Sequence, residues 1–280
     1  MSTQTHQTQP ATARASFVPT GSGLSFTGLL HSESIKLWSL RSTYWTFSLV
    51  VVASLGIAVL MAFAMSSGFD SAGGAMGIDH AQLYVMVATS GLSLGQLIVA
   101  VLGVLSISGE YSSGMIKSTL TAVPNRLPAL WAKVCVLFGF TFVVGLFSVV
   151  GAFLVATPIL GANDVTANLF GDGVILPLLG NALFLALIAV FAIGIGTIVR
   201  SSAGGIATVL GIILLLPTVV ALFSLLVEWV ADIVPFMFTV AGSEMITPNT
   251  MESWQAFLVV LVWVVVSLGT AALLLKRRDA

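Results

Sequence analysis

The chain alternates between six long runs of apolar residues and shorter segments that carry its charges. The runs occupy 45–66, 83–107, 134–157, 175–199, 206–227 and 255–275, and none has Asp, Glu, Lys or Arg in its interior. A helix needs about 20 apolar residues to cross the roughly 30 Å of membrane hydrocarbon, and each run is long enough. A charge at the centre of such a helix costs about 2.5 kcal/mol or more, so uncharged runs insert readily. The pattern predicts six transmembrane helices.

Composition points the same way. Of the 280 residues, 58% are hydrophobic and only 8% are charged, whereas a soluble domain has about 25% charged residues. A surface this poor in charge must face lipid, so we expect an all-α integral membrane protein. The one cysteine, Cys135, leaves no intrachain disulfide and serves most simply as a small apolar residue.

All ten Lys and Arg residues fall in alternate segments between the runs. They are Arg14, Lys36, Arg41, Lys117, Arg126, Lys133, Arg200, Lys276, Arg277 and Arg278. The other segments hold only acidic residues: Asp70, Asp79, Asp164, Asp172, Glu228, Asp232, Glu244 and Glu252. Basic residues in short loops stay on the cytoplasmic side of the membrane. The pattern therefore predicts a multi-pass protein of the cytoplasmic (plasma) membrane with both termini inside, and the charge asymmetry reflects topology rather than nucleic-acid binding.

The N-terminal 23 residues differ in composition from the rest. Residues 1–23 are rich in Thr, Gln, Ser, Pro and Gly and contain no apolar run. A secretory signal requires such a run, so we expect a disordered cytoplasmic tail, with the transmembrane domain occupying 24–280.

The segment 24–45, just before the first run, has amphipathic spacing. Its apolar face gathers Phe26, Leu29, Leu30, Leu37, Leu40 and Tyr44, and Glu33 interrupts that face. Trp38 and Trp45 suit the depth of lipid headgroups, and Lys36 and Arg41 suit their charge. We expect a helix lying in the cytoplasmic interface. It could serve only as an anchoring elbow or also contact a cytoplasmic partner.

Several residues within the runs stand out. Gly91 and Gly95, with Gly103 two turns later, form a small-residue stripe that permits close helix packing, either within one subunit or between subunits. Pro217 removes a helical hydrogen bond and predicts a kink in the fifth span. Gln96 and Asn181 are amides near span interiors, which either bond across helices or line a translocation path.

Two connecting segments invite a structural role. The loop 108–133 contains a helix-capable stretch, Glu110–Ala122, ended by Pro124 and Pro128. A short amphipathic helix continuous with two spans is suited to transmit motion, although the loop could be a mere connector in which Glu110 pairs with Lys117. The segment 228–255 is too apolar for a free loop and too interrupted to span, so we expect short re-entrant or interfacial helices on the outer side.

Three segments together resemble the permeases of ATP-binding-cassette (ABC) transporters, specifically the ABC type-2 family. The loop after the second span matches that family's pattern at Glu110, Tyr111, Gly114, Thr119, Leu120, Pro124, Arg126, Ala132 and Lys133. The stretch Ser39–Thr43 looks like the family's N-terminal elbow, and Gly194–Gly204 resembles its turn between the fourth and fifth spans. Each motif alone is short, but their combination with six oriented spans covers nearly the whole chain.

The resemblance implies a membrane subunit of an ABC exporter for an amphipathic or hydrophobic substrate, such as a peptide antibiotic or drug. Its partners would be two copies of a separate ATPase subunit and a second permease, either the same or homologous. The residues expected to couple to the ATPase are Glu110, Tyr111, Gly114, Lys117, Arg126 and Arg200, with Lys36, Trp38 and Arg41 on the interface helix. No cofactor is expected in this chain, because ATP and Mg would bind the partner. The segment 228–255 would form an external lid over the substrate path, or only a lipid-facing surface helix.

Missing features restrict the alternatives. No GxxxxGK[ST] phosphate loop occurs, so the chain does not hydrolyse ATP by that route. His6, His31 and His80 are far apart in sequence, so no metal site is expected. An ATP-independent transporter or channel is disfavoured because no carboxylate lies in mid-membrane. A membrane anchor or sensor subunit without transport activity is the remaining alternative.

Overall fold

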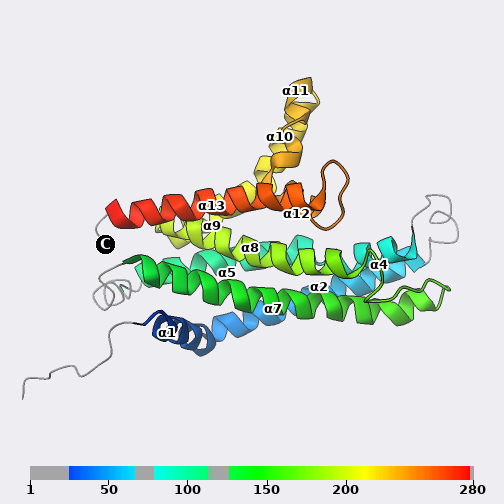
Figure 1. The fold of residues 1–280 in the computed structure, drawn as a ribbon, viewed down its shortest axis with the longest axis horizontal. Coiled ribbons are helices and arrows are strands. Elements are labelled where there is room, and N and C mark those ends of the chain that lie inside the picture. The colour runs from blue at the N-terminus through cyan, green and yellow to red at the C-terminus, as the bar shows by residue number, and fades with distance from the viewer. Residues whose placement is uncertain (1–24, 67–78, 113, 115–125, 278–280) are drawn as a thin grey trace, which may run out of the picture.

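The computed structural model describes residues 25–66, 79–112, 114 and 126–277, and in these ranges every regular element is a helix (Figure 1). The long helices are α2 (Arg41–Ser66), α5 (Leu92–Ser112), α7 (Arg126–Gly161), α8 (Ile175–Val199) and α13 (Ser253–Arg277). The shorter elements are α1 (Phe26–Ser39), α4 (His80–Thr89), α9 (Ser202–Leu210), the π-helical turn η2 (Gly211–Leu215), α10 (Leu216–Ser224), α11 (Glu228–Ala231), the 3₁₀ turn η3 (Val234–Phe236) and α12 (Phe238–Glu244). The predicted tail 1–23 and most of the predicted coupling helix lie outside the described residues.

Six helical segments of the described chain are long and apolar enough to cross a membrane, which confirms the predicted number. They are α2, α4 with α5, α7, α8, α9 through α10, and α13. The fourth helix has the bounds that the apolar run predicts, 175–199. The first and third begin earlier, at Arg41 and Arg126, because a membrane helix continues past its apolar run into the polar flank. We call the end of the bundle with Lys36, Lys133 and Arg200 the basic end, and the opposite end the acidic end.

Helix α8 is the core of the bundle. In its most apolar stretch 78% of the residues are buried, against 11% in the fifth span. It packs against α5, α7 and α13, and Figure 1 shows it running between α13 and α7. Its side chains are therefore enclosed by protein on nearly all sides, whereas the other spans each present one face outward.

The glycine stripe of the second span makes contacts within the subunit, which was the simpler of the two readings. A Cβ at Gly103 would lie 2.6 Å from the carbonyl oxygen of Ala189 on α8, so only glycine allows this approach. A Cβ at Gly91 would meet the backbone of Ser54 on α2. Small residues let helix backbones approach closely where no water drives association. The stripe thus fixes α5 against α8 and α4 against α2.

The outward faces of the bundle are apolar. Trp45, Val52, Leu60 and Phe147 are each at least 65% exposed, as expected for side chains that contact lipid. Cys135 is also exposed, on α7 near the basic end.

Two spans depart from straight helices. The second span is broken at Ser90 and Gly91, between α4 and α5, which the continuous apolar run 83–107 did not predict. In the fifth span the π-helical turn η2 directly precedes Pro217 in α10. Both features interrupt the regular hydrogen-bond ladder and bend helices. Figure 1 shows the result: α9 lies along the bundle, whereas α10 and α11 project away from it.

The segment between the fifth and sixth spans contains the short helices α11 and α12, in line with the expectation of short helices in 228–255. Helix α12 is inserted against the bundle, where Phe238 stacks on Phe191 with ring centroids 4.5 Å apart. Gly242 of the same helix faces the ring of Phe184 so closely that a Cβ would overlap it. The indole N–H of Trp263 donates to the carbonyl oxygen of Phe236 at 3.0 Å. These contacts tie the segment to α8 and α13.

A buried carboxylate organises the turn that follows α12. One oxygen of Glu244 accepts from the backbone N–H groups of Asn249 and Thr250, at 2.6 and 2.9 Å, and the other from the Thr250 hydroxyl at 3.0 Å. Burial raises the pKa of the Glu244 carboxyl, but these hydrogen bonds outweigh burial and hold the pKa below its ordinary value. The ionised form is thus the one that the fold selects.

Glu244→Gln should lower the free energy of unfolding by about 1–2 kcal/mol at neutral pH, because charged acceptors bond more strongly than neutral ones. A carboxyl with a depressed pKa stabilises the fold above its ordinary pKa, and this contribution disappears as the pH falls through the folded-state value. The deficit of the variant should therefore shrink below about pH 4. Thermal unfolding in detergent between pH 7 and 3 measures this, with the exposed Glu228→Gln as control. A deficit that stays constant with pH would contradict the assignment.

A candidate functional site at the basic end

Four charged side chains meet at the basic end of the bundle. Glu33 comes from α1, Lys36 from the next turn of the same helix, Glu110 from the end of α5 and Lys133 from the start of α7. Helix α1 forms locally because the Ser25 hydroxyl caps it, accepting from the N–H of Gly28 at 3.1 Å. It ends where Leu40 adopts an extended conformation. The helix predicted over 24–45 is therefore wrong at its C-terminal end, because the chain turns at Leu40 and starts α2.

The four groups form one connected ionic network, which we call the four-charge cluster. The Lys133 ammonium donates to Glu33 at 2.7 Å and to Glu110 at 2.9 Å. The Lys36 ammonium lies 2.5 Å from the other oxygen of Glu33 and 3.4 Å from Glu110. Two cations thus face two anions, and the cluster as a whole is neutral.

Burial makes this cluster more consequential than a surface ion pair. Glu33, Glu110 and Lys133 are each less than 10% exposed, and only Lys36 is partly open. Burial raises the pKa of the Glu33 carboxyl, but the ammonium groups of Lys133 and Lys36 together outweigh it and hold the pKa below its ordinary value. Burial likewise lowers the pKa of Lys36, but Glu33 and Glu110 together outweigh it, so the pKa is raised. Removing one partner would leave a buried charge uncompensated.

The cluster brackets the loop between the second and third spans. Glu110 lies two residues before the end of α5, and Lys133 lies in the first turns of α7. Their ion pair joins the two helix ends between which the loop 113–125 runs, and we call these ends the roots of the loop. Glu33 of α1 bonds to Lys133 directly, and its neighbour Lys36 bonds to Glu110. The cluster therefore joins α1, α5 and α7 at the two ends of this loop.

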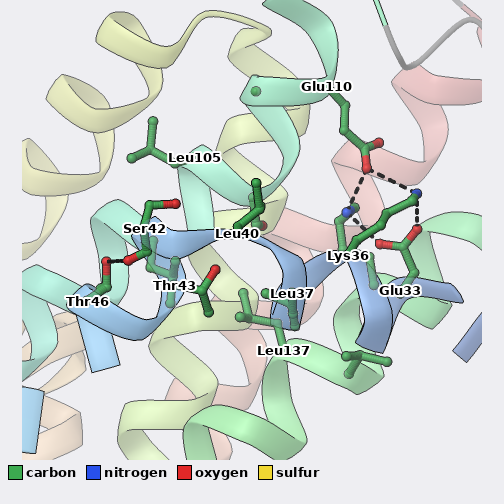
Figure 2. A pocket seen from close by; sticks show the side chains of 15 residues that line it. Glu33, Lys36, Leu37, Leu40, Ser42, Thr43, Thr46, Leu105, Glu110 and Leu137 are labelled. Carbon is green, nitrogen blue, oxygen red and sulfur yellow. Dashed lines mark hydrogen bonds and ion pairs between the residues drawn. The ribbon is translucent and has the colours of Figure 1, made fainter. Parts of the chain in front are cut away.

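A cavity of about 320 Å³ lies beside the cluster, between α1, α2, α5 and α7. Figure 2 shows Glu33, Lys36 and Glu110 pointing toward one another at one side of it. The rest of the lining includes several leucine side chains and the hydroxyl-bearing residues Ser42, Thr43, Thr46 and Ser106. The Thr46 hydroxyl donates to the backbone carbonyl oxygen of Ser42 at 2.8 Å.

A second contact at the basic end joins Tyr111 to Arg200. The Arg200 guanidinium carbon lies 5.3 Å from the centroid of the Tyr111 ring, a cation–π arrangement. Arg200 ends α8 in the left-handed conformation (φ 57°), with its N–H bonded to the carbonyl oxygen of Gly196. Two residues after Arg200, the hydroxyl of Ser202 donates to the hydroxyl oxygen of Ser108 on α5 at 2.9 Å. The turn between α8 and α9 is thereby attached to the same end of α5 as the cluster.

Gly114, three residues beyond Tyr111, has a positive φ of 71°, and its N–H bonds to the Tyr111 carbonyl oxygen at 3.3 Å. A side chain in this left-handed conformation costs about 1–2 kcal/mol. The left-handed backbone conformation thus explains why a glycine is favoured at position 114, three residues after Tyr111.

Gly114→Ala should therefore lower stability by about 1–2 kcal/mol, whereas Gly109→Ala should be neutral or slightly stabilising. Gly109 lies inside α5, where an added Cβ would meet no neighbour within 4 Å. Thermal unfolding of the two variants side by side tests the difference. Equal midpoints would mean that φ at Gly114 imposes no constraint.

The structure places the other predicted residues as follows. Trp38 lies on α1 with its ring edge against Phe140 of α7 at 5.5 Å, and Arg41 begins α2 at an exposed position. Arg126 begins α7, and Lys117 lies outside the described residues. Gln96 and Asn181 are not part of this site: Gln96 lines another cavity, and Asn181 is buried in α8.

Sequence reasoning did not assign two members of the cluster to a pairing role. Glu33 was visible as the one charge on the apolar face of an amphipathic helix, and Lys133 as a cation at the edge of an apolar run. Their pairing joins residues 100 positions apart, and no local pattern carries that distance. The available signal for a buried ion pair was the position of Glu33 on the apolar face of an amphipathic helix.

The fold and site define a multi-pass helical membrane protein in which α1 is ion-paired to the end of α5 and the start of α7. A family model described as "ABC-2 family transporter protein" matches residues 29–217, which includes the whole cluster and more than half of the chain. The chain therefore belongs to the ABC-2 family of transporter proteins and is an ABC type-2 permease. Proteins of this family are membrane subunits that associate with an ABC ATPase and are not themselves catalytic. A search of curated proteins finds no match.

Proposed function

We propose that the chain is the membrane-spanning subunit of an ABC exporter in the cytoplasmic membrane. Two permeases, identical or homologous, would sit on two ATPase chains that bind ATP and Mg²⁺. The basic end, with both termini and α1, faces the cytoplasm in this arrangement, since basic segments are retained there. Family membership supports the transport role, and the alternation of basic and acidic segments supports the orientation.

The four-charge cluster is the observation that carries the proposed coupling mechanism. An ATPase that pushes on the loop 113–125 moves Glu110 and Lys133, the residues at its two roots. Because Glu33 is bonded to Lys133, the push reaches α1, and through α7 it reaches the middle of the bundle. Tyr111 and Arg200 add the turn between α8 and α9 to the moving unit. Coupling by Gly114, Lys117, Arg126, Lys36, Trp38 and Arg41 remains part of the same proposal.

The substrate we propose is amphipathic or hydrophobic. The described spans place their ionised side chains at the basic end, and Gln96 is a neutral amide near the middle of the second span. A polar solute with several charges would find nothing to replace its hydration. Helix α12, inserted against α8, is suited to act as an external lid over the path.

The test is reconstitution with a candidate ABC ATPase, sought first among the proteins encoded beside this chain. We expect the two proteins to co-purify, and we expect ATP turnover by the ATPase to rise when the permease is present in lipid nanodiscs. Glu110→Gln should reduce this stimulation while leaving co-purification intact, because the residue transmits motion rather than forms the contact. If the proteins neither associate nor change ATP turnover, the export proposal is wrong.

Two other functions have distinct signatures. Transport by the chain alone in proteoliposomes, driven by an ion gradient without ATP, would establish a secondary transporter or channel. An unchanged export or resistance phenotype after substitution of Glu110 or Gly114 would favour an anchor or sensor subunit. The ABC-2 family match favours the exporter over both.

The basic segments would also form the docking surface for the ATPase. Neutralising Lys117 and Arg126 together separates docking from topology, because eight basic residues remain to orient the spans. We expect unchanged orientation and weakened ATPase association. Unchanged association would remove the docking role from these two residues.

A further inference from the structure

A second cavity, of about 270 Å³, lies where the second span is broken. It is lined by residues around the break between α4 and α5, by one face of α12, and by Phe184 of α8. Gln96, one of its lining residues, lies near the middle of the span His80–Tyr111. The cavity therefore sits at membrane depth, beside the break between α4 and α5, which Figure 1 shows at the side of α8.

The lining is unusually rich in hydroxyl groups. Besides Gln96 it includes Thr89, Ser90, Ser93 and Ser243, and none of its described side chains is charged. Empty cavities in proteins are lined by apolar side chains. The hydroxyl groups set this cavity apart and make it suited to a polar ligand.

The hydroxyl hydrogens are already used. Thr89, Ser90 and Ser243 each donate to a carbonyl oxygen three or four residues earlier in their own helices, at 2.7 Å. Ser93 does the same at 3.1 Å. A carbonyl oxygen only accepts, so in each pair the hydroxyl must be the donor. What these four groups present to the cavity is oxygen lone pairs.

A cavity of oxygen acceptors selects its ligand by charge and by hydrogen-bond donors. An anion would face lone pairs on several sides and is disfavoured. A primary ammonium has three N–H donors, no acceptor, and a positive charge that oxygen dipoles stabilise, as carbonyl rings do for ions in channels. All described charges of the acidic end are carboxylates, which favours the approach of a cation from that side.

We propose that this cavity binds the primary ammonium group of an amphiphile, whose apolar part lies along the adjoining spans. Identifying that amphiphile with the exported substrate rests on the proposed export function; the binding site itself does not. The proposal assigns Thr89, Ser90, Ser93 and Ser243 as acceptors and Gln96 as an amide acceptor at the same depth.

The test uses the chain alone in phosphatidylcholine nanodiscs. Because Cys135 is the one cysteine, Cys135→Ser with Ser93→Cys gives a single thiol at the cavity. Its rate of alkylation by a water-soluble maleimide is measured with decylammonium, decyltrimethylammonium or decyl sulfate present. We expect decylammonium to protect the thiol at about one tenth of the concentration that decyltrimethylammonium requires, the worth of one charged hydrogen bond. Asp232→Cys, at an exposed position outside the cavity, reports non-specific effects.

A matched pair of isosteric variants tests the acceptors. Thr89→Val removes one lining hydroxyl, and we expect it to raise the protecting concentration of decylammonium by about tenfold. Thr218→Val removes a hydroxyl with the same 2.7 Å bond within α10, away from the cavity, and should change nothing. Equal protection by the two cations, absence of protection, or equal effects of the two variants would overturn the proposal. Failure of ATPase coupling would leave these results unchanged, so the two proposals fail separately.

Discussion

Lys133→Met is expected to lower the free energy of unfolding by about 3–5 kcal/mol, the cost of leaving a buried charge without its partner. The ammonium of Lys133 bonds to both Glu33 and Glu110. Without it, both buried carboxylates lose a cation, and Lys36, which bonds to both, is partly exposed. The midpoint of thermal unfolding in detergent measures the loss.

A double variant separates charge imbalance from lost packing. Glu33→Gln with Lys133→Met leaves one neutral pair, Lys36 with Glu110, and should recover most of the lost stability. The same double variant removes the bond between α1 and the start of α7, where the loop ends. It should therefore stay folded but stimulate the ATPase less than the native chain does. A double variant as unstable as Lys133→Met alone would show that charge balance is not the cause.

Gly242→Val is expected to lower stability by about 3 kcal/mol, because inserting side-chain atoms into a filled site forces neighbours from their positions. The Cβ would overlap the ring of Phe184, which is 1% exposed and packs against Phe238 at 5.6 Å. Since Gly242 holds α12 against α8, the variant should also release the proposed lid.

Two comparisons make this result specific. Gly139→Val on α7 adds the same atoms where no neighbour lies within 4 Å, and should cost little. Adding Phe184→Ala to Gly242→Val should give a loss smaller than the sum of the two single losses, because the second change supplies the missing space. Additive losses would mean that the two residues do not compete for the same volume.

The sequence was sufficient for the number of spans, because insertion into lipid depends on a sum of local apolar contributions. It was less informative about interruptions. The break at Ser90 and Gly91 interrupts the continuous apolar run 83–107, and the contact of Gly91 with the backbone of Ser54 on α2 is long-range. The kink predicted at Pro217 was located correctly to within a turn, but the π-helical turn before it depends on how the freed backbone groups are satisfied.

The site was partly predictable for a related reason. Glu110, Tyr111 and Gly114 were recognisable because their pattern is local, and the structure gives each a distinct geometric role. Glu33 appeared only as an interruption of an apolar face, since its partner Lys133 is far along the chain. A long-range ion pair depends on how the helices pack, and the local sequence around either residue does not reveal its partner.

The same long-range pairing constrains the order in which the chain can mature. Glu33 is synthesised 100 residues before Lys133 and 77 before Glu110. The cluster therefore cannot be completed before the start of the third span has been synthesised. A chain truncated before residue 133 would lack the cation that joins α1 to α7 at this cluster.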